Sequence, residues 1–131
     1  MSTRQQLASD SQISNPLVQA SLLGEAVDNA QLAILVSDEE GHCIAVNKQA
    51  CALLGYTRAE LLDLQVPEFA PGADPRECHR EVHANGQSEG VTDAVRSDGT
   101  TFPVRYWSTA TRVAQMRLVL SVGRAETMAA A

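Results

Sequence analysis

Two histidines spaced four residues apart are the clearest sign of chemistry in this sequence. His79 and His83 lie in the stretch ECHREVHANG, and Cys78 directly precedes the first of them. In a helix, residues i and i+4 share a face, so the two imidazoles would lie side by side. A zinc site needs a further ligand, and the zinc hydrolase pattern needs a glutamate directly after the first histidine, where Arg80 stands. We therefore expect no metal and no catalytic site here, but a helix with both histidines on its solvated face and Cys78 turned inward.

The overall composition is that of one globular domain. The chain has 131 residues, 44% of them hydrophobic, and a formal net charge of −6, with no cluster of basic residues. That charge argues against nucleic acid as a direct partner. Its three cysteines are odd in number and show no CxxC spacing, which favours a reducing compartment. No signal peptide and no membrane span is apparent, so we expect a cytoplasmic protein without membrane contact.

The first third of the chain predicts a helix that needs a partner. Residues 1–14 are polar and are expected to be disordered, whereas Asn15-Pro16 is a typical helix start. The predicted helix, 15–31, is amphipathic and carries an apolar stripe that includes Val18, Leu22, Leu23 and Val27. The apolar surface of this stripe is larger than expected for a helix that is exposed to solvent on all sides. The helix therefore either covers the sheet of its own chain or pairs with a second copy.

The remaining elements alternate between strands and short helices. Strands are expected at 33–37 and 42–47, followed by helices that begin after Asn47, Thr57 and Asp74. The last of these helices should end at Gly86. Three strands follow, at 89–96, 100–113 and 115–123, and 125–131 reads as a tail. This order predicts an α+β fold with an antiparallel sheet.

Several short motifs, taken in this order, resemble the PAS domain family. They are Asp38 after the first strand, Asn47 after the second, Leu54-Gly55-Tyr56, the Thr57–Leu61 segment and the Arg96–Gly99 turn. The resemblance covers about 26–124 and places the domain itself at 32–124. It implies a five-stranded antiparallel sheet flanked by short helices on one face, with the amphipathic helix in front. It further implies a sensory domain without catalysis, which binds a small ligand or protein partner, forms homodimers and signals to a downstream partner or effector domain.

The same resemblance raises the question of a cofactor. Haem-based oxygen sensors of the family carry their axial histidine in an Arg-x-x-His setting followed later by DGTTFP, and Arg76 to His79 and the 98–103 segment are similar. However, the helix and its following linker are shorter here, and Gly90 falls near the place of the arginine that contacts oxygen. The flavin-binding branch needs a motif that is absent, so flavin is not expected. Haem with His79 as axial ligand remains the alternative to a domain without haem.

The resemblance also indicates where a ligand and a partner would bind. A ligand would lie between the inner face of the sheet and the short helices, although a filled core is an equally simple expectation. Candidate pocket residues are Ile34, Val36, Leu54, Phe69, Val82, Val104 and Leu118. In the strand at 100–113, Phe102, Val104 and Tyr106 should face inward and Trp107 outward. The candidate partner surface therefore combines Trp107 with the helix stripe Val18, Leu22, Leu23 and Val27.

Overall fold

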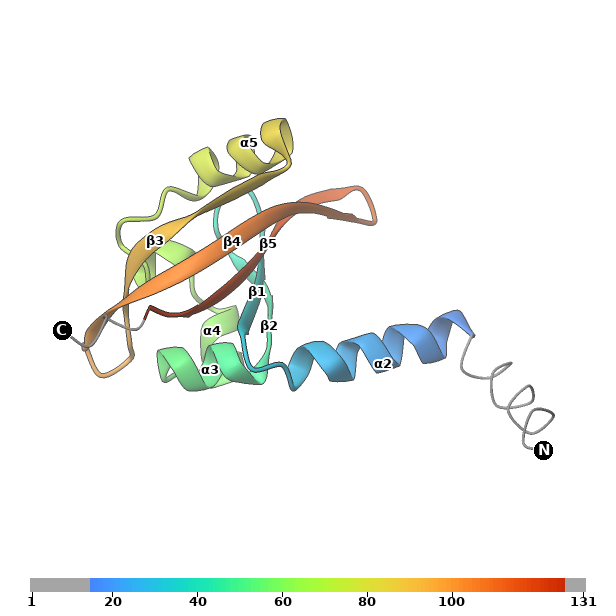
Figure 1. The fold of residues 1–131 in the computed structure, drawn as a ribbon, viewed down its shortest axis with the longest axis horizontal. Helices are drawn as coiled ribbons and strands as arrows, with labels where there is room; N and C mark the ends of the chain where they lie inside the picture. The colour runs from blue at the N-terminus through green and yellow to red at the C-terminus, as the bar shows by residue number, and fades with distance from the viewer. Residues whose placement is uncertain (1–14, 127–131) are drawn as a thin grey trace.

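The protein folds as a twisted antiparallel sheet with helices along it, in a computed structural model that describes residues 15–126 (Figure 1). The predicted disordered segment 1–14 and most of the tail at 125–131 lie outside the described residues. The elements, in chain order, are α2 (Pro16–Asp28), β1 (Ala33–Ser37), β2 (Cys43–Val46), α3 (Lys48–Leu54), α4 (Arg58–Leu62), η1 (Val66–Glu68), α5 (Pro75–Asn85), β3 (Gln87–Val95), β4 (Thr101–Val113) and β5 (Met116–Ala125). None of the described helices is long and apolar enough to cross a bilayer.

Local capping interactions set the ends of the helices. In α4, Thr57 and Glu60 form a reciprocal capping box, with the Thr57 N–H donating to Glu60 and the Glu60 N–H donating to Thr57. Helix α5 begins after Asp74, whose carboxylate accepts from the Glu77 N–H at 3.2 Å. It ends at Gly86, which has a φ of 90°. Both helix starts and the end of α5 confirm the sequence-based prediction, because capping depends on residues only three or four positions apart.

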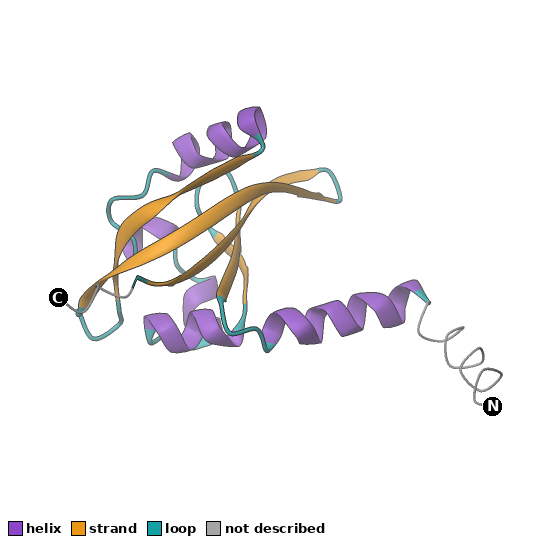
Figure 2. Cartoon of the chain, viewed as in Figure 1, coloured by secondary structure: helices purple, strands orange, loops and turns teal. Residues whose placement is uncertain are grey.

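The five strands pair in the order β2-β1-β5-β4-β3, and every pairing is antiparallel. The central strand, β5, therefore lies next to β1, from which it is far apart in sequence. The helices α3, α4 and α5 connect β2 to β3 and line the sheet (Figure 2). This arrangement confirms the predicted α+β fold with a five-stranded antiparallel sheet.

The apolar core lies between one face of the sheet and these short helices. Leu61 and Val82 are completely buried, and Phe69 and Phe102 are 6% and 8% exposed. We call this side of the sheet the inner face. Val104 and Tyr106 of β4 lie on this inner face, together with the residues of β3 and β5 to which they are paired. Directly paired residues of antiparallel strands point to the same side of a sheet.

Helix α2 does not cover the sheet of its own chain. It projects from the rim of the sheet, and none of its residues is buried (Figure 1). Four residues of its apolar stripe are exposed: Val18, Leu22, Leu23 and Val27. Of the two arrangements expected from the sequence, the one in which this helix shields its own sheet is therefore wrong. The amphipathic pattern itself could not decide between them, since it shows that a helix has an apolar face but not what that face contacts.

Candidate functional site

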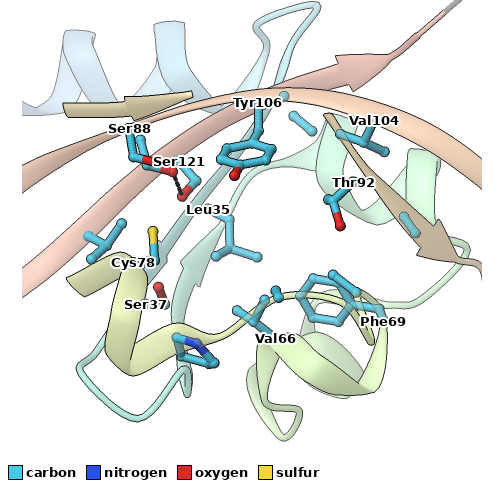
Figure 3. Close-up of a pocket in the computed structure, with 18 of the residues that line it drawn as sticks. Leu35, Ser37, Val66, Phe69, Cys78, Ser88, Thr92, Val104, Tyr106 and Ser121 are labelled. Carbon is cyan, nitrogen blue, oxygen red and sulfur yellow. Dashed lines mark hydrogen bonds between the residues drawn. The ribbon is translucent and has the colours of Figure 1, made fainter. Parts of the chain in front are cut away.

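A cavity of about 370 Å³ lies between the inner face of the sheet and the helices α3 and α5 with η1 between them (Figure 3). This volume falls within the lower part of the range of small-molecule sites, about 300–1,000 Å³. Its apolar wall comprises Leu35, Leu54, Val66, Phe69, Val104 and Val119. Phe69 and Val66 form the wall opposite the sheet in this view. The structure therefore provides a space that a small molecule could occupy.

The structure places three of the seven candidate pocket residues on this wall. Leu54, Phe69 and Val104 line the cavity. The other four, Ile34, Val36, Val82 and Leu118, do not line it. In β1 the cavity-lining residues are Ala33, Leu35 and Ser37, one position out of phase with the prediction. Both phases of β1 are apolar, so alternation alone could not indicate which phase points inward.

Hydroxyl and thiol groups form the polar part of the cavity. Its polar lining residues include Ser37, Cys78, Ser88, Thr92, Tyr106, Ser108 and Ser121. Ser108 and Ser121 are hydrogen-bonded to each other, with 2.8 Å between their Oγ atoms. The Tyr106 ring lies in the middle of the view and turns its hydroxyl toward the opposite wall (Figure 3). Among these hydroxyl-bearing residues, the sequence identified only Tyr106 as facing inward, and the signal was its alternation with Phe102 and Val104.

The thiol of Cys78 is held in its neutral form. Burial raises the pKa of Cys78, and the nearby carboxylate of Glu81 raises it further, against the lowering effect of a hydrogen bond from Ser108. The expected inward orientation of Cys78 agrees with its place on the cavity wall. A neutral, half-buried thiol is a poor nucleophile, so Cys78 acts here as a small lining group.

Charge on the cavity wall is of one sign. Asp74, Glu77 and Glu81 line the α5 side, and no lysine, arginine or histidine is among the lining residues. Asp74 caps α5, and Glu77 forms an ion pair with Arg80 on the helix surface. Among the described residues, the Glu81 carboxylate has neither a hydrogen bond nor an ion pair. The cavity therefore has a negative edge and no cation among its lining residues.

The two histidines of α5 lie on the other side of this helix and do not face the cavity. His79 is only 6% exposed, and His83 is half-buried. Their rings are in contact, with 4.4 Å between centroids and a tilt of 40° between the ring planes. Their Nε2 atoms lie 3.1 Å and 3.2 Å from the carbonyl oxygens of Arg117 and Leu118. The prediction of a solvated histidine face is therefore wrong. The physical reason is that α5 packs against the first residues of β5, a contact that no local pattern reveals.

These contacts also test whether the histidines could hold a metal or a haem iron. A carbonyl oxygen only accepts, so the Nε2 of each ring must donate a proton to it and cannot bind iron while that bond persists. His79 does not line the cavity, and the cavity has no cationic side chain to pair with haem propionates. Within residues 15–126, no three histidine, cysteine or acidic side chains are grouped so as to hold a metal ion. The side chains present therefore do not fit haem in the arrangement observed.

The half-buried position of His83 predicts a pH-dependent stability. The pKa of His83 lies below its ordinary value of 6.5 because burial, the His79 ring and the charges of Arg117 and Arg112 outweigh the Leu118 carbonyl. The unfolded chain then binds a proton more readily than the folded one. The stabilisation is complete above about pH 6.5 and is lost as the pH falls below that value toward the folded-state pKa.

We expect His83→Gln to flatten the fall in urea midpoint between about pH 7 and pH 5. The quantity compared is the difference in urea midpoint between the two proteins at each pH, because every other titratable group is present in both. His42 is the matched control: it lies on the surface beside Asp38, with its Nδ1 atom 3.0 Å from the carboxylate. His42→Gln should leave the His83 contribution intact. An equal slope in the wild type and in His83→Gln would contradict the prediction.

A set of hydrogen bonds connects the cavity wall to the last turn of α2. The amide of Asn47, 2% exposed, accepts from the N–H groups of Ile34 at 2.9 Å and Ala50 at 3.0 Å. It donates to the carbonyls of Val27 at 2.8 Å and Leu32 at 2.9 Å. We call these four bonds the Asn47 clasp. Because Ala50 and Leu54 of the same helix line the cavity, the clasp joins the cavity wall directly to α2.

An ion pair reinforces this connection at the surface. Asp28, the last residue of α2, contacts the Arg58 guanidinium and lies 3.7 Å from the Lys48 ammonium. It also accepts from the Lys48 N–H at 3.2 Å. Exposed ion pairs contribute little stability, but they restrict the direction of the helix end. The end of α2 is thus held against the starts of both α3 and α4.

The outer face of the sheet carries a group of apolar side chains that are partly exposed. Val122 is paired with Ile34 on one side and with Trp107 on the other, and Leu120 is paired with Val36. These five residues form what we call the outer patch. Trp107 remains 36% exposed, with the Arg124 guanidinium 5.9 Å from its ring centroid. The structure thus places Trp107 and the stripe of α2 on exposed surfaces, as the candidate partner surface requires.

Comparison with known proteins agrees with this architecture. The PAS domain family model matches residues 31–123. A PAS domain of a two-component sensor histidine kinase superposes with a TM-score of 0.76 at 16% identity, over 86% of this chain and all of that one. The PAS domain of an HTR-like protein from Haloarcula marismortui gives 0.71 at 23% identity, over 82% of this chain and 97% of that one.

A further similar structure was determined with a small molecule. It is the PAS domain of a LuxR-family transcriptional regulator from Burkholderia thailandensis in complex with ethanol, with a TM-score of 0.64 and 18% identity. The similarity covers 78% of this chain and 95% of that one. No curated protein sequence matches this chain. Since the family model matches 31–123, well over half of the sequence, this chain belongs to the PAS domain family, the sensory domains of signal-transduction proteins.

Proposed function

We propose that the domain senses a small molecule in its cavity and passes the signal through α2 within a homodimer. The observation that carries this proposal is the Asn47 clasp, because it joins a helix of the cavity wall to α2, which projects from the domain. A ligand that displaces α3 would alter the contacts of Asn47 with Val27. A similar PAS domain was determined in complex with ethanol, a small uncharged molecule, which is consistent with this proposal.

Dimerisation is supported by the apolar surface that the single chain leaves exposed. Leu22 and Leu23 of α2 are 51% and 65% exposed, and the outer patch adds Trp107 at 36%. Exposed apolar patches of this kind typically mark interaction sites. A second copy is the simplest partner for a helix whose apolar stripe stays exposed to this degree among the described residues. A downstream effector domain or separate signalling protein would then respond to the arrangement of the two helices.

Native mass spectrometry of the purified protein tests both parts at once. We expect a dimer, with a mass increment from a retained small molecule in at least part of the population. A monomer at every concentration would contradict dimerisation. A protein without a retained molecule, in which no added compound shifts the resonances of cavity residues, would contradict ligand sensing.

The alternative function is a haem-based sensor with His79 as the axial ligand. It would require the His79 ring to leave the Arg117 carbonyl and turn around α5 toward the cavity. The propionates would also meet the acidic edge of the cavity. A visible absorption spectrum after haem reconstitution distinguishes the two functions. We expect no Soret band of a bound haem, and a band that disappears in His79→Ala would instead favour the alternative.

A further inference from the structure

We infer that the ligand of the cavity is a small uncharged molecule with an apolar body and one hydrogen-bonding group, which the hydroxyl of Tyr106 recognises. This inference rests on the ligand-sensing function proposed above and specifies its ligand class. Three observations support it: a tyrosine hydroxyl on the cavity lining that has no hydrogen-bond partner among the described residues, a wall that is largely apolar apart from small hydroxyl and thiol groups, and charges of a single sign at the edge.

The Tyr106 hydroxyl is the polar group best placed to contact a ligand. Among the described residues it has no hydrogen-bond partner. It is also not a buried unsatisfied atom, so it faces accessible space rather than packed side chains. In Figure 3 it points toward the space in front of Val66 and Phe69. A polar group left unpaired in a mostly apolar site discriminates strongly between ligands that do and do not bond to it.

Gly90 positions this hydroxyl. The Tyr106 side chain lies across Gly90 on the neighbouring strand β3, to which it is directly paired. A methyl group at Gly90 would lie 3.1 Å from the Tyr106 Oη atom and 3.4 Å from Cζ. These distances are short enough that the ring would have to move by a few tenths of an ångström. Any larger residue at position 90 would therefore displace the hydroxyl from its present place.

The edge of the cavity disfavours an anionic ligand. Asp74, Glu77 and Glu81 line it on the α5 side, and no cation lines it. The N-terminus of α5 would by itself attract an anion, but the Asp74 carboxylate already caps it. Glu81 influences the cavity interior, because its charge adds to burial in raising the pKa of Cys78. A carboxylate ligand would lose its water and meet like charge, which costs free energy without compensation.

Three probes of matched shape test this ligand class: benzyl alcohol, benzoate and toluene. Each is titrated into the ¹⁵N-labelled protein, and affinity is taken from the shifts of cavity residues such as Val104 and Phe69. We expect benzyl alcohol to bind, and benzoate to bind at least about tenfold more weakly, a difference of about 1.4 kcal/mol. Tyr106→Phe should weaken benzyl alcohol by roughly threefold to tenfold and leave toluene unchanged, since one neutral hydrogen bond is lost.

Two further variants make the test specific. Tyr56→Phe removes the other tyrosine hydroxyl of the chain, outside the cavity lining, and should change neither affinity. Gly90→Ala keeps the hydroxyl but displaces it, so it should weaken benzyl alcohol more than toluene. Equal losses for both probes in Tyr106→Phe, or no loss, would overturn the role of Tyr106.

The outcomes also separate this inference from the function on which it rests. Benzoate binding in the cavity as tightly as benzyl alcohol would overturn the ligand class while leaving ligand sensing intact. If no probe shifts the cavity residues, a molecule retained in native mass spectrometry decides by its charge: a neutral one supports the inference and an anion overturns it. If no probe binds and no molecule is retained, both the ligand class and the sensing function are overturned.

Discussion

Replacing Asn47 with alanine is expected to lower the free energy of unfolding by about 3–4 kcal/mol, among the larger effects of a single substitution in this domain. The Asn47 clasp contains four hydrogen bonds, and its side chain is 2% exposed. Alanine would leave the N–H groups of Ile34 and Ala50 and two carbonyls without their partners. It would also remove the N-cap of α3, which by itself contributes about 1 kcal/mol. Urea denaturation followed by circular dichroism measures the loss.

Aspartate at position 47 separates the two halves of the clasp. Asn47→Asp keeps the oxygen that caps α3 but loses the donor to the Val27 and Leu32 carbonyls, and it places the carboxylate against them. We expect a substantial loss in this variant as well, together with looser attachment of α2, measured as faster hydrogen exchange near Val27. Asn29→Ala is the matched control, because Asn29 bonds only at the exposed end of α2 and to Lys48. A loss in Asn47→Ala no greater than that in Asn29→Ala would contradict the importance of the clasp.

Introducing charge into the apolar stripe of α2 is expected to convert the proposed dimer into a monomer. Leu23→Glu together with Val27→Glu would place two carboxylates on the face that pairs with the second copy. These side chains are 65% and 42% exposed in the single chain, so their replacement should leave its fold intact. Burying two unpaired charges in an interface costs several kcal/mol, so we expect the dissociation constant to rise by at least about a hundredfold. Sedimentation velocity measures the change.

A control variant with the same added charge on the other side of α2 tests the face rather than the charge. Ser21→Glu with Gly24→Glu adds two carboxylates opposite the apolar stripe, and nothing lies within 4 Å of a methyl group placed at Gly24. This variant should remain dimeric, because its new charges face solvent. If both double variants dissociate equally, general repulsion explains the result. If neither dissociates, α2 is not the dimer contact and the outer patch around Trp107 becomes the surface to test.

Local sequence determined the helices and the turns between elements. Asn15, Asp74 and Gly86 mark helix ends through contacts within three or four residues, so their meaning does not depend on any tertiary contact. Strand β4 could likewise be oriented from its own residues. Its two phases differ in character, with Phe102, Val104 and Tyr106 on one side and polar or mixed residues on the other. The order and spacing of these local motifs are also sufficient to indicate the PAS family.

Only the tertiary structure decided which side of the other strands faces the cavity. β1 is apolar in both phases, so its own residues do not show which phase faces the pocket. The sequence predicts Ile34 and Val36 on the cavity wall, whereas the structure places Leu35 there. The burial of His79 depends on α5 packing against the start of β5, where the contacting residue, Arg117, is 38 positions away in sequence. The direction of α2 likewise depends on the Asn47 clasp. In each case, the decisive contact joins segments far apart in the chain, and a local pattern contains no information about which of two chemically acceptable faces finds a partner.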